Sequence, residues 1–340
     1  MKITKTDTFP DYILPSHLNG RPIDILAVGS SVLEQVIRID KWPQWGQQID
    51  SPVHGVTYSV GGCATNVACF VGRMGGKASL ATVIGEGRFG QEVWQEVIRS
   101  GVDASFVKKI SHKEGNLVIE FTNADGEWMV MDYFDPVVSL TQECVPPLNV
   151  FIQAKILYID GFSFTFSGSP EVIDLFIKKG NQAGCVISSD GSTPAAKSNP
   201  EYLRSLYERS NIVSANSNEA LIVTKTQDLN KAIKTIQQMG PDISVIKVGE
   251  MGSYLVTPNR ITHIPAFPVK VIDTVGAGDA YNAALLLSLC QNKSLRVASF
   301  RGSAAGALAC KGAGSLTSHF TFKEIDSLIN SNMGDKSKNE

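Results

Sequence analysis

The sequence lacks a strong excess of charge of either sign. Its 31 Lys and Arg residues and 33 Asp and Glu residues give a formal net charge of −2, and no basic run is longer than two residues. Nucleic-acid binding needs a basic patch or stripe. The composition therefore argues against a nucleic-acid partner and favours a small molecule.

Long hydrophobic runs are also missing. No uninterrupted apolar stretch approaches the about eighteen residues of a membrane-spanning helix, and the first residues, MKITKTDTFPDYILPSH, contain no apolar core of a signal peptide. The cysteines are few and irregularly spaced, as expected of reduced thiols rather than of a disulfide framework or a zinc site. We therefore expect a cytoplasmic protein with no membrane partner. The cysteines are Cys63, Cys69, Cys144, Cys185, Cys290 and Cys310.

Several common catalytic motifs are absent. Gly76-Lys77 is followed by Ala78 and lacks the upstream glycine, so the sequence has no Walker A motif. It also lacks the G-x-S-x-G turn of a Ser-His-Asp hydrolase. The five histidines are scattered without metal-ligand spacing.

The sequence does contain short β-branched runs that alternate with longer amphipathic stretches. The runs IDILAVG, KASLATVIG, KILYIDG, CVISSD, NIVSAN and ISVIKVG are nearly continuously apolar. Such runs, separated by helices, are typical of a parallel sheet that is covered on both faces. We predict an α/β fold with a central, mostly parallel sheet and helices on both faces. The expected helices span residues 64–74, 89–100, 170–180, 228–239, 278–290, 294–311 and 321–330.

Two segments, 35–60 and 113–133, interrupt this alternation. Both show strand-like patterns around turn residues, which in the second segment are residues 123–126. We assign both to a small antiparallel β-sheet that acts as a lid. The expected organisation is one domain at 21–330 that carries both lid insertions, with loosely ordered tails at 1–20 and 331–340.

The most informative stretch is VIDTVGAGDAYNAALLLSLC, in which a strand-like run ends at Asp273 and a long helix begins near Gly278. Gly276, Ala277 and Gly278 leave no bulky side chain between the N–H groups of the helix start and a ligand, so phosphate oxygens fit there. The helix dipole favours an ionised Asp279, which then accepts a proton from an attacking hydroxyl. The alternative is a glycine-rich helix start capped by an aspartate.

The extended pattern Asp273-Thr274-x-Gly276-Ala277-Gly278-Asp279 specifies six positions, each matched by chance about once in fifteen. It resembles the C-terminal motif of the ribokinase-like, or PfkB, family of carbohydrate and nucleoside kinases. The resemblance implies an ATP-dependent kinase that needs Mg²⁺ and phosphorylates a hydroxyl of a small sugar, polyol or nucleoside. It also implies that Asp279 is the general base and that residues 276–278 form the anion hole.

Further motifs follow in the family's order. Gly61, Gly62 and Asn66, within GGCATN, are similar to the family's GGxxxN motif, which contacts the phosphoryl acceptor. Asn66 offers both a donor and an acceptor to hydroxyl groups. Cys63 and Ala64 stand where phosphosugar kinases of the family commonly have a lysine-containing GGKG start, which favours an uncharged acceptor.

The nucleotide side has its own matches. Asn216 and Glu219 look like the family's N-x-x-E motif, in which a carboxylate and an amide organise Mg²⁺ through its waters. The same spacing also fits a helix N-cap with an acid at the third position, so a structural role, alone or in addition, stays open. Lys247, Gly249 and Gly252 resemble the family's nucleotide-side glycine motif.

The resemblance further implies a site for a monovalent cation such as K⁺. It places this site at Asp273 and Val275, beside the small-residue segment that ends near Gly314.

A competing motif lies at residues 85–90. Gly85-Glu86-Gly87-Arg88-Phe89-Gly90 spells the GxGxxG of a dinucleotide-binding turn between a strand and a helix. The acidic ribose partner expected about twenty residues later is met only ambiguously, by Asp103. An oxidoreductase therefore stays an alternative, as does a ribokinase-like protein that binds ligand without turnover.

The sequence departs from the family at Glu34. Members usually carry an aspartate at this place, and the additional methylene of glutamate moves the carboxylate by about 1.5 Å. Either the acceptor differs, or Glu34 faces away from it. The lid segments are rich in aromatic residues, which stack on an acceptor, pack the sheet or line a subunit interface. Because exposed lid sheets often pair, we expect a homodimer through the lid. The aromatic residues are Trp42, Trp45, Tyr58, Trp128, Tyr133 and Phe134.

Overall fold

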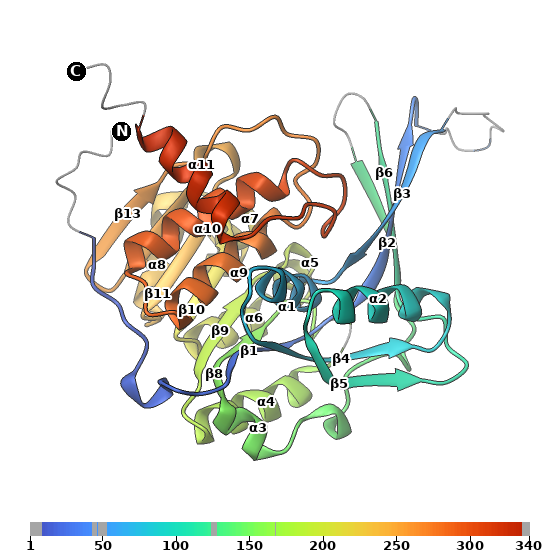
Figure 1. Ribbon diagram of the computed structural model, residues 1–340, viewed down its shortest axis with the longest axis horizontal. Helices are drawn as coiled ribbons and strands as arrows, with labels where there is room; N and C mark the ends of the chain where they lie inside the picture. Colours follow the sequence, from blue (N-terminus) through green and yellow to red (C-terminus); the bar gives the residue numbers. More distant parts are fainter. Residues whose placement is uncertain (1–8, 43–45, 47–52, 124–127, 167, 335–340) are drawn as a thin grey trace.

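The computed structural model describes residues 9–42, 46, 53–123, 128–166 and 168–334 (Figure 1). For Trp128, Met333 and Gly334 it describes the backbone alone. Some sequence-based predictions lie outside the described residues. They concern Trp45, most of the turn at 123–126 and the outermost parts of both tails.

A nine-stranded sheet forms the centre of the molecule. Its strands are β1 (Ile23–Val28), β4 (Ala78–Gly85), β5 (Asp103–Ile110), β8 (Ala154–Ile159), β9 (Val186–Asp190), β10 (Ile212–Asn216), β11 (Ile243–Lys247), β12 (Ser253–Thr257) and β13 (Arg260–Ile264). They lie in the order β13-β12-β11-β10-β9-β8-β1-β4-β5. Pairing is parallel from β11 to β5, and β12 and β13 are added in antiparallel pairing at one edge.

Helices cover both faces of this sheet. On one face lie α1 (Cys63–Arg73), α2 (Arg88–Arg99), α9 (Ala277–Cys290), α10 (Leu295–Ala309) and α11 (Phe322–Gly334). On the other lie α3 (Leu148–Gln153), α4 (Pro170–Gln182), α5 (Thr193–Ser198), α6 (Pro200–Glu208), α7 (Ser217–Thr224) and α8 (Leu229–Gln238).

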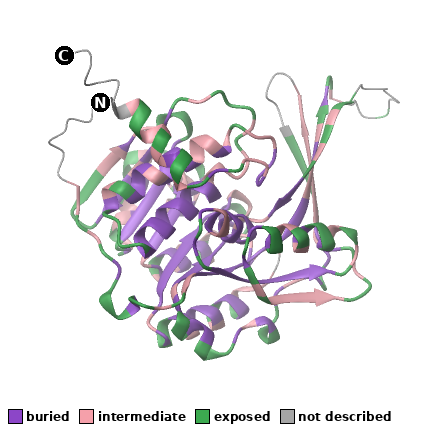
Figure 2. Ribbon diagram, in the orientation of Figure 1, coloured by how far each residue is buried: buried purple, intermediate pink, exposed green. Residues whose placement is uncertain are grey.

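The central strands are buried on both faces (Figure 2). In β1, Ile25 and Ala27 belong to one core, whereas Leu26 and Val28 belong to the core on the other face. Successive side chains of a strand point to opposite faces, so a strand between two cores must be continuously apolar. The predicted α/β class, with a mostly parallel sheet covered on both faces, is confirmed.

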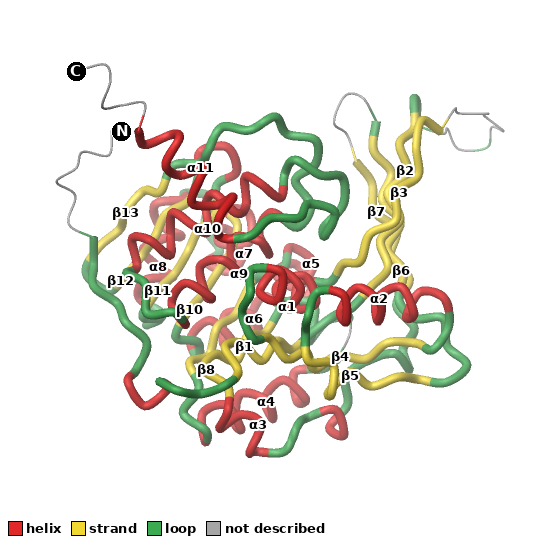
Figure 3. The backbone as a smooth tube through the Cα atoms, viewed as in Figure 1, coloured by secondary structure: helices red, strands yellow, loops and turns green. Residues whose placement is uncertain are grey.

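A second, four-stranded sheet extends from the main body beyond the helices (Figure 3). It consists of β2 (Val32–Ile39), β3 (Val53–Gly61), β6 (Leu117–Thr122) and β7 (Trp128–Tyr133), in the order β3-β2-β6-β7. The sheet is not wholly antiparallel as predicted. Each of its two hairpins is antiparallel, but β2 and β6 pair in parallel because the first strand of each hairpin runs in the same direction.

The described part of the N-terminal segment packs against the main domain. Leu14 and Leu18 are buried, and Phe9 lies against Phe300 of α10. Tyr12 also packs against this core, whereas Ile13 is exposed. Within the described residues, no helix combines the length and apolar character needed to cross a membrane.

Candidate active site

The polar residues singled out by the sequence gather at the carboxyl ends of the parallel strands. Asp190 ends β9, Asn216 ends β10 and Lys247 ends β11, and these strands are neighbours. The starts of α1 and α9 pack against the same region through their shared core. In open α/β sheets, ligands bind at this edge of the strands.

Asp279, in the first turn of α9, meets Asn66 of α1. The Asn66 side-chain amide donates a 2.7 Å hydrogen bond to one Asp279 carboxylate oxygen, and both residues are buried. Burial raises the pKa of Asp279 to about 7, against the lowering effect of the Asn66 hydrogen bond. The Asn66 Oδ1 atom is also buried and has no hydrogen-bond partner among the described residues. The pair thus presents a carboxylate that titrates near neutrality beside a free acceptor.

Atoms of other segments lie so close to the two glycines before Asp279 that a side chain there would crowd against them. Gly276 is the N-cap of α9 with φ of 77°, and a Cβ added to it would lie 2.5 Å from the carbonyl oxygen of Ser315. A Cβ on Gly278 would lie 3.0 Å from the Lys247 ammonium. A glycine N-cap offers no side chain to the N–H groups of the first helical turn, although the Ala277 N–H already donates to the Thr274 carbonyl at 3.2 Å. No side chain therefore caps this helix start against an anion.

Lys247 lies within a cluster of buried carboxylates. Its Nζ is 3.3 Å and 3.4 Å from the two carboxylate oxygens of Asp190. Asp190 also accepts a 2.6 Å hydrogen bond from the Asn282 amide, one turn along α9 from Asp279. Through these contacts Asp190 links β11 to α9.

Asn216 and Glu219 form a capping box at the start of α7. The Asn216 Oδ1 atom accepts from the Glu219 N–H at 2.9 Å, while the Glu219 carboxylate accepts from the Asn216 N–H at 2.9 Å and from its side-chain amide at 2.7 Å. The structural role that the sequence left open is thus present. Burial raises the pKa of Glu219 to about 7, and Asp190 acts in the same direction.

Gly249 and Gly252 lie in the connection from β11 to β12. Gly252 has φ of 93°, and its N–H donates to the Gly249 carbonyl at 2.9 Å. A Cβ on Gly252 would overlap the backbone carbonyl of Ile264. Packing of the β12–β13 hairpin is therefore sufficient to explain Gly252.

Asp273 is brought beside the loop that follows α10. Its carboxylate accepts from the Val275 N–H at 3.0 Å and from the Gly314 N–H at 2.8 Å. The structure thus joins the two segments between which the sequence places a monovalent cation.

Glu34 lies on the small sheet and turns toward the same loop. Its carboxylate accepts from the Ser315 hydroxyl at 2.7 Å and from the Ser315 N–H at 3.3 Å, and it also lies against Gly61. Burial raises the pKa of Glu34 to about 7, although the hydrogen bonds from Ser315 lower it. Gly62 has φ of 93° and lies against the backbone carbonyl of Ser30, which explains the second glycine of that pair.

Asp160 is a buried residue of this region that sequence analysis missed. Its carboxylate accepts hydrogen bonds from the N–H groups of Ser30 and Ala64, both at 3.0 Å, and of Ser163 at 2.7 Å. It thereby holds the loop after β1 and the start of α1 together. The available signal was its position, because Asp160 directly follows the apolar run of β8.

The GxGxxG turn at 85–90 is filled by the protein itself. The Gly87 N–H donates to the Lys113 carbonyl at 2.7 Å, and the Arg88 N–H donates to the Glu114 carboxylate at 2.8 Å. These groups occupy the helix start where a dinucleotide would place its pyrophosphate. The turn therefore packs against residues 113–115, and the oxidoreductase alternative loses its support.

Two of the aromatic residues of the small sheet, Tyr58 and Tyr133, face away from Glu34. The register places Tyr58 beside Gln35, and Tyr133 beside Leu117, on the face opposite to Glu34. The side chains of Tyr58 and Tyr133 are exposed, and Phe134 stacks on Phe166 at 4.9 Å between ring centroids.

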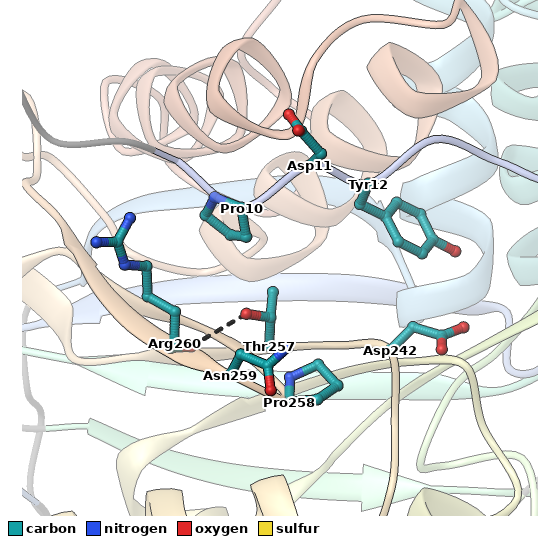
Figure 4. A pocket seen from close by; sticks show the side chains of 8 residues that line it. All are labelled: Pro10, Asp11, Tyr12, Asp242, Thr257, Pro258, Asn259 and Arg260. Atoms are coloured by element: carbon teal, nitrogen blue, oxygen red, sulfur yellow. Dashed lines mark hydrogen bonds between the residues drawn. The ribbon is translucent and has the colours of Figure 1, made fainter.

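An open pocket of about 430 Å³ lies far from these residues (Figure 4). It is formed by the N-terminal segment, by Asp242 before β11 and by the turn between β12 and β13. These segments border the amino end of β11, whereas Lys247 lies at its carboxyl end. The pocket therefore does not belong to the candidate site.

Comparisons with known proteins find kinases of similar sequence. Probable fructokinase-5 of Arabidopsis thaliana is 25% identical over 249 residues, which are 71% of this chain and 76% of the relative. Aminoimidazole riboside kinase of Salmonella typhimurium is 27% identical over 274 residues, or 76% and 83% of the two chains.

A solved structure from E. coli, assigned as a ribokinase II in complex with ATP and Mg²⁺, superposes with a TM-score of 0.77. It is 19% identical and the match covers 91% of this chain and 99% of that one, which confirms the ribokinase-like fold. The family model described as pfkB family carbohydrate kinase matches residues 23–320. The chain therefore belongs to the pfkB family of carbohydrate kinases and is a phosphotransferase.

Proposed function

We propose that this chain transfers the γ-phosphoryl group of ATP to a hydroxyl of an uncharged sugar, polyol or nucleoside. The observation that carries the proposal is the 2.7 Å hydrogen bond between Asn66 and Asp279. It joins two motifs that are 213 positions apart in one buried site. Relatives named as a fructokinase and an aminoimidazole riboside kinase, and a structural neighbour that contains ATP and Mg²⁺, support it.

Asp279 is the proposed general base. With a pKa of about 7 it is substantially ionised at neutral pH and still basic enough to take a proton. The acceptor hydroxyl loses its proton to Asp279, its oxygen bonds to the γ-phosphorus, and the bond from the γ-phosphorus to the bridging oxygen breaks to release ADP. The open N–H groups at the start of α9 then face the negative charge on the phosphoryl oxygens.

The proposed acceptor site lies on the α1 side of Asp279. Asn66 Oδ1 is a buried acceptor without a partner among the residues that the structure describes, and a substrate hydroxyl can donate a hydrogen bond to it. Gly61 and Gly62 border this side, where Glu34 and the Ser30 carbonyl approach their backbone, and Glu34 completes it. Because Glu34 and Asp279 are carboxylates and Cys63 supplies no cation, the site disfavours an acceptor that is already phosphorylated.

The residues present also fit a nucleotide with Mg²⁺. Among the residues described, no group of three or more His, Cys, Asp or Glu side chains is arranged to hold a metal ion by itself. Mg²⁺ does not need such a group when it keeps several waters and binds substrate phosphates. Glu219 and Asp190 are the neighbouring carboxylates that would hold its waters, and the ion would neutralise phosphate charge. Lys247, Gly249 and Gly252 would border the nucleotide.

A monovalent cation is proposed at Asp273 and Val275. The carboxylate of Asp273 beside the loop at Gly314 supports this, since hard cations prefer oxygen ligands. Titration with KCl against choline chloride at constant ionic strength tests it. A flat response refutes the cation site and leaves the kinase proposal untouched.

The small sheet is the proposed dimer interface. Its face opposite to Glu34 carries exposed large apolar side chains on both edge strands, which is the pattern of an interaction surface. These residues are Val56 and Tyr58 on β3 and Met129, Met131 and Tyr133 on β7.

A direct test is an ATP-consumption screen of the purified chain against a panel of sugars, polyols and nucleosides. We expect acceptor-dependent formation of ADP with at least one uncharged acceptor and little activity with phosphosugars. A chain that binds ATP and acceptor yet forms no ADP would instead be a binding protein.

A further inference from the structure

We propose that Lys247 binds the phosphoryl group that is transferred, and that Asp190 is the positioning residue that holds its ammonium over the first turn of α9. This inference rests on the proposed kinase function and gives Lys247, which borders the proposed nucleotide site, a specific role within it.

The position of Lys247 is the first argument. It is the last residue of β11 and pairs with Asn216 of β10, next to the capping box of α7. Its ammonium lies 3.0 Å from the point that a Cβ on Gly278 would occupy. Lys247 therefore reaches from the nucleotide side to the open helix start. A cation at this point faces the same space as the free N–H groups of α9.

The contacts of Lys247 are the second argument. Its distances of 3.3 Å and 3.4 Å to Asp190 are longer than the about 2.7 to 2.9 Å of a strong charge-assisted hydrogen bond. Asp190 has closer donors in the Asn282 amide at 2.6 Å and the Gly191 N–H at 2.9 Å. The carboxylate therefore stays hydrogen-bonded if the ammonium moves away from it. Lys247 has three donor hydrogens, so it can keep a contact with Asp190 and still donate to a ligand.

The charges around Lys247 are the third argument. Burial alone lowers the pKa of Lys247, but Asp190, Glu219 and Asp279 outweigh burial and hold that pKa above its ordinary value. The ammonium therefore stays protonated at neutral pH. A polyanionic phosphate that enters beside three carboxylates needs such a compensating cation, and Lys247 is the cation placed at the helix start.

A purely structural role is the competing explanation. Lys247 would then only neutralise the buried carboxylates, and its removal would lower stability without distinguishing one nucleotide from another. The two explanations differ in whether the effect depends on the γ-phosphate.

The experiment is calorimetric titration of the full chain with the Mg²⁺ complexes of AMP-PNP and of ADP. Hydrogen bonds to charged groups correspond to roughly 10- to 100-fold in affinity. We expect Lys247→Met to weaken AMP-PNP binding by about this factor and ADP binding by less than about threefold. Lys247→Arg keeps the charge and should retain part of the preference for AMP-PNP.

The matched control is Lys225→Met, because Lys225 forms a 2.6 Å ion pair with Glu201 at an exposed surface. It should leave both affinities unchanged. Thermal unfolding accompanies each variant. If Lys247→Met does not fold, Lys247→Gln takes its place, since its neutral amide still donates to Asp190.

Equal losses for the two nucleotides, or no loss for either, overturn the assignment of Lys247. If the unmodified chain binds neither nucleotide, the proposed function fails instead. The two failures are therefore distinguishable.

Discussion

Glu34 and Ser315 connect the small sheet to the start of α9. The Glu34 carboxylate accepts hydrogen bonds from both the hydroxyl and the N–H of Ser315, and the Ser315 carbonyl lies against Gly276 at the start of α9. The small sheet is thereby in contact, through Ser315, with the proposed anion-binding turn. Glu34 has this structural partner in addition to the acceptor role proposed for it.

The first prediction separates these two roles of Glu34. Glu34→Asp should change the ranking of sugars and nucleosides as acceptors, because it withdraws the carboxylate by about 1.5 Å. Ser315→Ala is the control, since it removes a donor to Glu34 and leaves the carboxylate in place. Ser315→Ala should change the rate with every acceptor by the same factor and leave their ranking unchanged. Steady-state kinetics over an acceptor panel measure both variants. If Glu34→Ala leaves the ranking and every acceptor KM unchanged, Glu34 serves only to hold Ser315.

The second prediction concerns the general base. Asp279→Asn keeps the shape of the side chain and can still pair with Asn66 through its amide oxygen, but it cannot accept the proton. Turnover should fall by about 10² to 10⁴ while the fold and the affinity for nucleotide persist. Rapid-quench or coupled assays measure kcat, and circular dichroism checks the fold. A near-normal kcat would rule out Asp279 as the base.

The third prediction is a pH dependence. The base must be ionised, and the pKa of Asp279 in the free protein lies at about 7, so kcat/KM for the acceptor should fall as the pH is lowered through this value. The Asn66 hydrogen bond lowers this pKa, so Asn66→Ala should move the acidic limb of the profile to higher pH. The measurement is kcat/KM for the acceptor from pH 5.5 to 8.5 at saturating ATP.

The same Asn66→Ala variant should raise the acceptor KM strongly and leave the KM for ATP nearly unchanged. Removing the partner of a buried hydroxyl costs roughly 1 to 3 kcal/mol. If the acidic limb of the pH profile does not shift in Asn66→Ala, a group other than Asp279 controls that profile.

Much of the fold could be predicted from the sequence because it depends on local patterns. Continuous apolar runs identify strands between two cores, and apolar residues with helical spacing identify amphipathic helices such as α2 and α8. The short helices α3, α5 and α6 were not predicted. Helix α5 has only six residues, too few for a clear period, and α6 begins at a proline directly after the cap Asn199.

The candidate site could be predicted where its residues stand in dense motifs, as Asp279 and Asn66 do. The role of Asp160 and the contact of Asp190 with Lys247 could not be predicted. Asp160 and Asp190 are isolated polar residues at strand ends, and their partners come from distant segments that only the folded sheet brings together. The glycines at 85–90 suggested a dinucleotide site that the fold does not form. Close backbone packing and ligand binding both require glycine, so the sequence alone does not distinguish them.

The last prediction concerns assembly through the small sheet. Side chains alternate between the faces of a strand, so Met131 lies on the exposed apolar face and Val130 lies on the face that carries Glu120. If the apolar face is the dimer interface, Met131→Glu places a carboxylate in a desolvated contact and should convert a dimer to a monomer. Val130→Glu adds the same charge one residue away on the other face and should remain dimeric. Light scattering after size-exclusion chromatography measures both masses. A chain that is already monomeric without substitution, or two variants that dissociate alike, would exclude this face as the interface.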